Sequence, residues 1–171
     1  MSIKLPNRVF VVMGVSGCGK TTLGKALAAA LACEFYDGDD FHPPENVKKM
    51  ASGVPLTDKD RAEWLRSLAE HITDCLTRGE TAVFACSALK QSYRTILQGS
   101  RGEHVRFIYL EGNYDVIWQR LQRRVGHYMK ADMLRSQFDT LEPPEKADAL
   151  ILDVRQTITE WVNAVMNDAA L

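Results

Sequence analysis

The sequence lacks several features that would place it in a specialised class of protein. No apolar stretch approaches the roughly 20 residues that cross a bilayer, and residues 1–8 contain no hydrophobic segment of a signal peptide. A formal net charge of −1 offers no basic surface for nucleic acid. We therefore expect a cytoplasmic protein that binds neither membranes nor nucleic acid.

Paired cysteines are also absent. The four cysteines are Cys18, Cys33, Cys75 and Cys86. They form no C-x-x-C pair, which argues against a disulfide framework and against a zinc site. The 171 residues are 46% hydrophobic and 25% charged, as in an ordinary globular protein. A single domain over 1–171 is expected, since a chain of this length buries about 70% of its unfolded surface.

What the chain does contain is a phosphate-binding motif, because residues 14–21 match G-x-x-x-x-G-K-[ST]. An apolar run over 9–13 precedes it and an apolar helical pattern follows it, so a buried strand and a helix should flank the loop. Backbone N–H groups of such a loop surround phosphate oxygens, and the helix dipole attracts the same anion. The predicted nucleotide contacts in this segment are Gly14, Val15, Ser16, Gly17, Cys18, Gly19, Lys20, Thr21 and Thr22.

Within this loop, Lys20 should reach the β- and γ-phosphates of ATP, and the Thr21 hydroxyl should bind Mg²⁺. A dinucleotide fingerprint fits less well because a third glycine is missing. Cys18 has two interpretations. A thiol beside a helix N-terminus can have a lowered pKa and be oxidisable, whereas the simpler alternative, which we favour, is a small residue that fills space.

Strand-like runs alternate with helical patterns, which is typical of a parallel α/β sheet. The runs cover 9–13, 34–36, 81–86, 105–110 and 149–154. Capping boxes over 57–60 and 157–160 predict the starts of two helices. Segments of about 40–60 and about 124–140 break the alternation. Because ligands bind at the carboxyl ends of parallel strands, we interpret these segments as a substrate-binding insert and a lid.

An acidic turn over 36–42 follows the second predicted strand. Its three carboxylates repel one another unless a cation or a substrate proton relieves the repulsion. Asp37 and Asp39 are two positions apart, so in an extended segment both side chains would point to the same side. One could orient Mg²⁺ through water while the other accepts the proton of an attacking hydroxyl. Taken alone, the turn could also be merely solvated.

Cationic side chains cluster near the predicted lid. Arg120 and Arg124 would share a helix face and neutralise the charge of a moving phosphoryl group, while Arg123 would be solvated. His42 and His127 lie in the two irregular segments and could contact substrate or lid. These features favour a small kinase, and the alternative is a regulatory module that binds ATP without an acceptor. A GTPase switch is not supported because its Asn-Lys-x-Asp motif is missing.

Taken together, these blocks resemble the bacterial-type gluconate kinases over nearly the whole chain. They cover 14–21, 37–43, 46–50, 53, 55–56, 58, 60–61, 64–65, 86–90, 93–94, 124–127, 136–138 and 141–143. The resemblance implies ATP- and Mg²⁺-dependent phosphorylation of D-gluconate at its 6-hydroxyl. It also implies a three-layer P-loop kinase fold, with a five-stranded parallel sheet similar to that of shikimate and adenylate kinases, and a homodimer.

The resemblance also implies roles for individual residues. By similarity to shikimate kinases, Asp39 would activate the hydroxyl and Asp37 would hold a water on Mg²⁺, with Arg61 as a clamp for the substrate carboxylate. An arginine suits that task because its planar fork binds carboxylates bidentately. The expected catalytic residues are Lys20, Asp39 and Arg124. The expected substrate contacts are Asp39, His42, Arg61, Ser87, Lys90, Arg94 and His127, and the expected metal site consists of Thr21 and Asp37.

Overall fold

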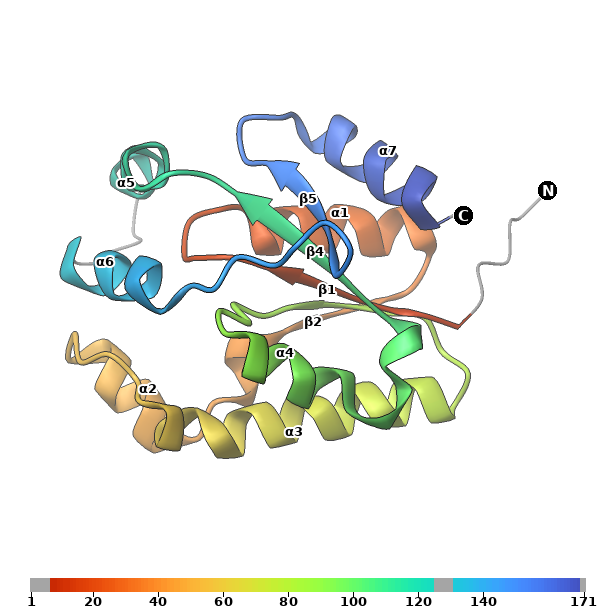
Figure 1. Cartoon of the computed structure of the whole chain (residues 1–171), viewed down its shortest axis with the longest axis horizontal. Coiled ribbons are helices and arrows are strands. Elements are labelled where there is room, and N and C mark those ends of the chain that lie inside the picture. The colour runs from red at the N-terminus through yellow and green to blue at the C-terminus, as the bar shows by residue number, and fades with distance from the viewer. Residues whose placement is uncertain (1–6, 125–130, 170–171) are drawn as a thin grey trace.

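Five parallel strands form one sheet through the centre of the molecule, in the order β2-β3-β1-β4-β5 (Figure 1). A computed structural model describes residues 7–124 and 131–169 of the chain. The strands are β1 (Val9–Met13), β2 (Glu34–Asp37), β3 (Ala82–Ala85), β4 (Val105–Glu111) and β5 (Ala149–Asp153). The predicted fold class, a three-layer P-loop kinase fold with a five-stranded parallel sheet, is confirmed. No strand end differs from the predicted runs by more than one residue.

The central strand β1 shows why this sequence forms a sheet covered on both faces. Its residues alternate between two hydrophobic clusters, with Val9, Val11 and Met13 in one and Phe10 and Val12 in the other. All five side chains are fully buried. A continuous run of β-branched and aromatic residues fits such a position, because neither face of the strand meets water.

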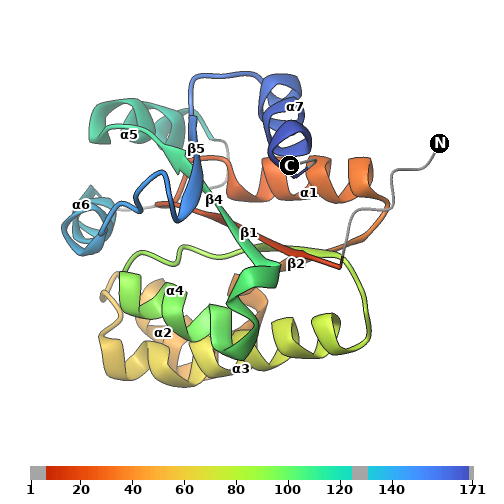
Figure 2. The same ribbon diagram turned by 45° about the vertical axis from the view of Figure 1, so that its right-hand side comes forward.

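Helices cover the two faces of the sheet. α1 (Lys20–Leu31) and α7 (Ile158–Ala169) lie on one face, and α3 (Asp58–Thr77) and α4 (Gln91–Gln98) lie on the other (Figure 2). The capping box predicted over 57–60 is present, since the side chains of Thr57 and Asp60 each accept a hydrogen bond from the other's backbone N–H.

The carboxyl edge of the sheet carries the irregular segments. The predicted insert contains α2 (Pro44–Ala51) and the start of α3, and it follows the short 3₁₀ helix η1 (Gly38–Phe41). α5 (Tyr114–Arg123) and α6 (Ala131–Thr140) lie at the same edge, α6 within the predicted lid segment (Figure 1). A second 3₁₀ segment, η2 (Gly99–His104), leads into β4 at the opposite edge.

A salt bridge and a hydrogen bond hold α2 against the start of α3. The Lys49 ammonium pairs with the Asp60 carboxylate at 2.9 Å, which joins α2 to α3 and lowers the pKa of Asp60 to about 2. The buried amide of Asn46 also donates to the Asp60 backbone oxygen at 2.8 Å. α2 is therefore held against the start of α3 at two points, which fixes one wall of the space above the sheet.

Candidate active site

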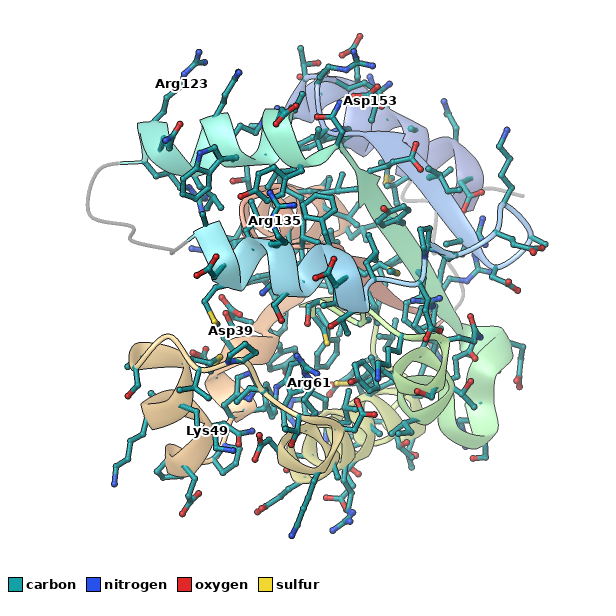
Figure 3. All side chains as sticks on the ribbon, turned by 60° about the vertical axis from the view of Figure 1, so that its left-hand side comes forward. Asp39, Lys49, Arg61, Arg123, Arg135 and Asp153 are labelled. Atoms are coloured by element: carbon teal, nitrogen blue, oxygen red, sulfur yellow. The ribbon has the colours of Figure 1, made fainter. Side chains whose placement is uncertain are left out.

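A cavity of about 350 Å³ lies at the carboxyl edge of the sheet, among the P-loop, the insert and α6. Figure 3 shows Asp39 and Arg61 in the space between α6 and the helices of the insert. Sequence-predicted site residues that line the cavity are Ser16, Gly17, Gly19, Lys20, Thr21, Asp37, Asp39, His42, Arg61, Ser87 and Arg124. Residues far apart in the sequence thus meet in one place.

The P-loop encloses its own lysine. Lys20 Nζ donates hydrogen bonds to the backbone oxygens of Gly14 and Val15, each at 3.0 Å. Because of these two bonds, Lys20 lies folded across the loop, with its charge at the cavity where phosphate oxygens would bind. Gly17 has a φ of 80°, and a Cβ there would meet the Leu121 side chain at 2.7 Å, so the position favours glycine.

Other P-loop residues do not reach the cavity. Gly14, Val15 and Cys18 are buried behind the loop, and Thr22 is exposed in the first turn of α1. Burial raises the pKa of the Cys18 thiol, and its side chain is fully covered. The oxidisable-thiol interpretation of Cys18 is therefore wrong, and the residue fills space beneath Gly14, where an added Cβ would lie 2.8 Å from its sulfur.

The acidic turn has a shape that the sequence argument did not anticipate. Asp39 lies in η1 rather than in an extended segment, and its backbone N–H donates to Asp37 Oδ1 at 3.0 Å. The prediction that Asp37 and Asp39 project from one extended segment is therefore wrong, although both carboxylates line the cavity. Gly38 is buried so close to β3 that a Cβ would lie 2.5 Å from the Ala85 oxygen, which brings the turn against the sheet.

His42 is held in one protonation state. Its Nδ1 lies 3.3 Å from Nδ2 of Asn46, whose amide nitrogen also donates to the Asp60 backbone oxygen. Because that amide nitrogen is a donor, Nδ1 must accept, and the ring proton lies on Nε2. Nε2 is 3.8 Å from Asp39 Oδ1. Burial, and secondarily the charge of Arg61, lowers the pKa of His42 to about 4, so the ring is neutral at neutral pH.

Arg61 is oriented by a chain of polar contacts. Its Nη1 donates to the Tyr93 hydroxyl at 3.0 Å, and that hydroxyl in turn donates to the Asp58 carboxylate. Lys90 Nζ completes the chain by pairing with both Asp58 oxygens at 3.0 Å. These contacts with Tyr93 and Lys90 lower the pKa of Asp58. No local sequence pattern pointed to Asp58 and Tyr93 as supports of Arg61.

Two predicted substrate contacts are not at the cavity. Lys90 is paired with Asp58 and lies outside the cavity lining. Arg94 is 3% exposed, and its guanidinium donates to the backbone oxygens of Ala88 at 2.8 Å and Glu142 at 2.9 Å. Both assignments are therefore corrected. Arg94 is a structural cation that joins α4 to the segment before β5, and Lys90 supports the Arg61 chain.

The two arginines predicted to act together at the lid, Arg120 and Arg124, do not lie together. α5 ends at Arg123, and Arg124 has extended backbone angles, so Arg120 and Arg124 do not share a helix face. Arg124 lines the cavity, whereas Arg120 donates to the backbone oxygen of Val154. Arg123 is exposed and points away from the molecule (Figure 3). The remaining lid candidate, His127, lies outside the described residues.

The lid side of the cavity includes a contact that sequence reasoning missed. The backbone N–H of Ser16 donates to Gln137 Oε1 at 2.7 Å, and Gln137 Nε2 donates to the Ser16 hydroxyl at 3.1 Å. Met133 and Ser136 of α6 line the cavity beside it. The signal was absent from the local sequence because the two partners are 121 positions apart.

The metal site expected at Thr21 and Asp37 fits a lightly coordinated cation. Both side chains line the cavity near Lys20. Across residues 7–124 and 131–169 there is no group of three or more histidine, cysteine or acidic side chains arranged to hold a metal ion. Mg²⁺ in kinases is bound by one or two protein oxygens together with phosphates and waters, so this sparse donor set suits it.

None of the described helices is both long and apolar enough to span a bilayer.

Comparisons with known proteins agree with this geometry. Residues 16–168 match the family model described as shikimate kinase. A thermosensitive gluconokinase of Escherichia coli is 44% identical over 151 residues, which cover 87% of this chain and 80% of that protein. A gluconokinase of Arabidopsis thaliana is 45% identical over 175 residues, covering 95% and 93% of the two chains. The crystal structure of a gluconokinase from Sinorhizobium meliloti has a TM-score of 0.87 at 40% identity, covering 97% and 93%.

Proposed function

This chain belongs to the gluconokinases and carries a shikimate kinase family domain, and we propose that it transfers the γ-phosphoryl group of ATP to D-gluconate. The 6-hydroxyl is the proposed acceptor, so the products are 6-phospho-D-gluconate and ADP. One observation carries the proposal. A single cavity combines the P-loop cation Lys20, the carboxylate Asp39 and the guanidinium of Arg61, which are the groups needed for a phosphate donor, an attacking hydroxyl and an acid substrate.

The donor half consists of the P-loop and two cations. Lys20 is placed to bind the β- and γ-phosphates, and Arg124 faces the same cavity to offset charge as the phosphoryl group moves. In our proposal Thr21 and Asp37 hold Mg²⁺, Asp37 through a water molecule. The ion, when bound, neutralises phosphate oxygens.

The acceptor half orients gluconate between a cation and a base. Arg61 binds the carboxylate of gluconate, for which its planar fork is suited, while Ser87 and His42 contact the hydroxyls. His42 offers a fixed Nε2–H donor rather than a base. Asp39 accepts the proton of the 6-hydroxyl as that oxygen attacks phosphorus, because its carboxylate lines the cavity beside Lys20 and its side chain is 84% exposed.

A substrate screen tests this function. Purified protein with ATP and Mg²⁺ should release ADP in a coupled assay with D-gluconate, and a Lys20→Met variant should not. Shikimate, nucleoside monophosphates and other sugar acids serve as competing acceptors. If one of these supports turnover while gluconate gives only the buffer rate, the acceptor assignment is overturned. Mass spectrometry of the product would separate phosphorylation at the 6-hydroxyl from that at other positions.

We also propose that the enzyme works as a homodimer in the cytoplasm, on the strength of its resemblance to bacterial gluconate kinases. Light scattering on the eluate of a sizing column should give twice the 19.2 kDa mass of the chain. A mass of one chain at working concentration would contradict the dimer without affecting the proposed reaction.

A further inference from the structure

Gln137 and Ser16 form a two-way amide–serine pair across the mouth of the cavity. Ser16 donates from its backbone N–H to Gln137 Oε1 at 2.7 Å and accepts from Gln137 Nε2 at its hydroxyl, at 3.1 Å. Because one hydrogen bond runs in each direction, the pair fixes both the distance and the relative orientation of Ser16 and the Gln137 side-chain amide. Ser16 is the third residue of the P-loop, so the pair connects α6 directly to the loop that would hold the phosphates of ATP.

Other side chains of α6 contact α5. The guanidinium of Arg135 lies over the ring of Tyr114 at 4.6 Å, and Phe138 packs edge-on against the same ring at 5.7 Å. Figure 3 shows Arg135 between the two helices. In the described part of the chain, both hydrogen bonds from α6 to the P-loop belong to Gln137. Gln137 therefore ties α6 to the donor loop by hydrogen bonds, while α5 packs against that loop through Leu121.

The pair occupies one residue of the phosphate-binding loop. It engages the N–H and the hydroxyl of Ser16, which lines the cavity, whereas Gly17, Gly19, Lys20 and Thr21 line the cavity farther along the loop and take no part in the pair. A nucleotide can therefore contact the loop at these four residues while the pair is in place. Met133 and Ser136, on the same face of α6 as Gln137, also line the cavity. Moving α6 would move that wall relative to the donor.

We propose that Gln137 is a positioning residue that holds the α6 wall in register with the P-loop, so that the acceptor hydroxyl meets the γ-phosphoryl group. This inference rests on the proposed function. Transfer between two bound substrates is sensitive to alignment, and a displacement of about 1 Å can cost on the order of 100-fold in rate. Loss of the pair should therefore lower kcat while leaving nucleotide affinity nearly unchanged.

Three variants and a control separate this role from general packing. Gln137→Leu removes both hydrogen bonds at similar size, and Ser16→Ala removes only the hydroxyl acceptor. We expect kcat to fall by about 10- to 100-fold for Gln137→Leu, with its Kd for ATP within about twofold of wild type, and by less for Ser16→Ala. The double variant should be no slower than Gln137→Leu, because the same pair is already broken. Gln122→Leu, on the exposed side of α5, is the matched control and should behave as wild type.

A second measurement does not depend on turnover. In nucleotide-free protein, hydrogen exchange at the Ser16 amide and along α6 should be faster in Gln137→Leu than in wild type, and unchanged in Gln122→Leu. Unchanged exchange, or single effects on kcat that add fully in the double variant, would overturn the proposal. If wild type fails to phosphorylate gluconate, the proposed function fails instead, and the exchange result still decides whether Gln137 holds α6 in place.

Discussion

The imidazole of His42 lies flat on the indole of Trp64, with ring centroids 4.2 Å apart and planes 17° from parallel. Trp64 is itself anchored, since its Nε1–H donates to the backbone oxygen of Gly38 at 2.7 Å. The stack therefore links α3 to the acidic turn. It also covers one face of the imidazole, leaving the His42 side chain 3% exposed, so a positive charge on the ring would be poorly solvated.

The first prediction concerns pH and stability. The pKa of His42 is about 4 in the folded protein and about 6.5 when unfolded, so the unfolded chain binds more protons between these values. The free energy of unfolding should therefore fall as the pH drops through 6.5, and this contribution should level off near pH 4. Urea denaturation at pH 7.5, 6 and 5 would measure it.

His42→Gln should flatten that pH dependence, because glutamine does not titrate. His104→Gln is the control, since His104 is 46% exposed and pairs only with its neighbour Glu103. Equal slopes for wild type and His42→Gln would show that the ring is not excluded from protonation by its surroundings.

The second prediction concerns the base. Asp39→Asn should lower kcat by roughly 10²–10⁴-fold while leaving ATP affinity intact, because an amide cannot accept the hydroxyl proton. Asp40→Asn changes an exposed neighbour that lies outside the cavity lining, and it should have little effect. Steady-state kinetics with a nucleotide-binding titration would test both. Near-normal turnover of Asp39→Asn would remove this carboxylate from the mechanism.

The third prediction concerns the carboxylate clamp. Arg61→Ala should raise the KM for gluconate by roughly 10- to 100-fold, as expected for loss of a charged hydrogen bond of about 1.5–3 kcal/mol. Tyr93→Phe should raise it less, because it removes only the hydroxyl that orients Arg61. Arg66→Ala, exposed on the same helix, is the control. A KM for gluconate that does not change in Arg61→Ala would assign this arginine to structure.

The fourth prediction separates structural cations from substrate contacts. Arg94→Met should lower the free energy of unfolding by roughly 2–4 kcal/mol, because buried backbone oxygens lose their donors. Lys90→Met should cost far less, since its partner Asp58 is 65% exposed. Urea denaturation would measure both losses. If Arg94→Met is instead as stable as wild type and its KM for gluconate rises, Arg94 binds substrate after all.

The parts predicted correctly from sequence are those encoded by neighbouring residues. The P-loop motif, the alternation of strands and helices and the capping box at Thr57 each occupy a short stretch, so local patterns indicate them. The family resemblance is confirmed for the same reason, since it rests on contiguous blocks. These features placed Lys20, Asp39 and Arg61 on segments that the sheet topology brings to one edge.

The remainder depended on side chains that meet across the fold. The family resemblance implied that Arg94 contacts substrate, and only its three-dimensional surroundings show that it is buried among carbonyl oxygens. Arg124 was predicted to lie on the same helix face as Arg120, but the helix ends at Arg123. Asn46, Tyr93 and Gln137 belong to the blocks that carry the family resemblance, but they were given no role. The residues around a polar side chain in the sequence do not indicate which distant group it will bind.

The separation of Ser16 from Gln137 has a consequence for the order in which the enzyme is made. At about 5–20 residues per second, a ribosome needs roughly 6–24 s to add the 121 residues between them. The nucleotide loop therefore leaves the ribosome well before the helix that faces it. A nascent chain, or a product of premature termination before residue 137, contains the complete phosphate-binding motif but cannot join it to the wall of the acceptor site.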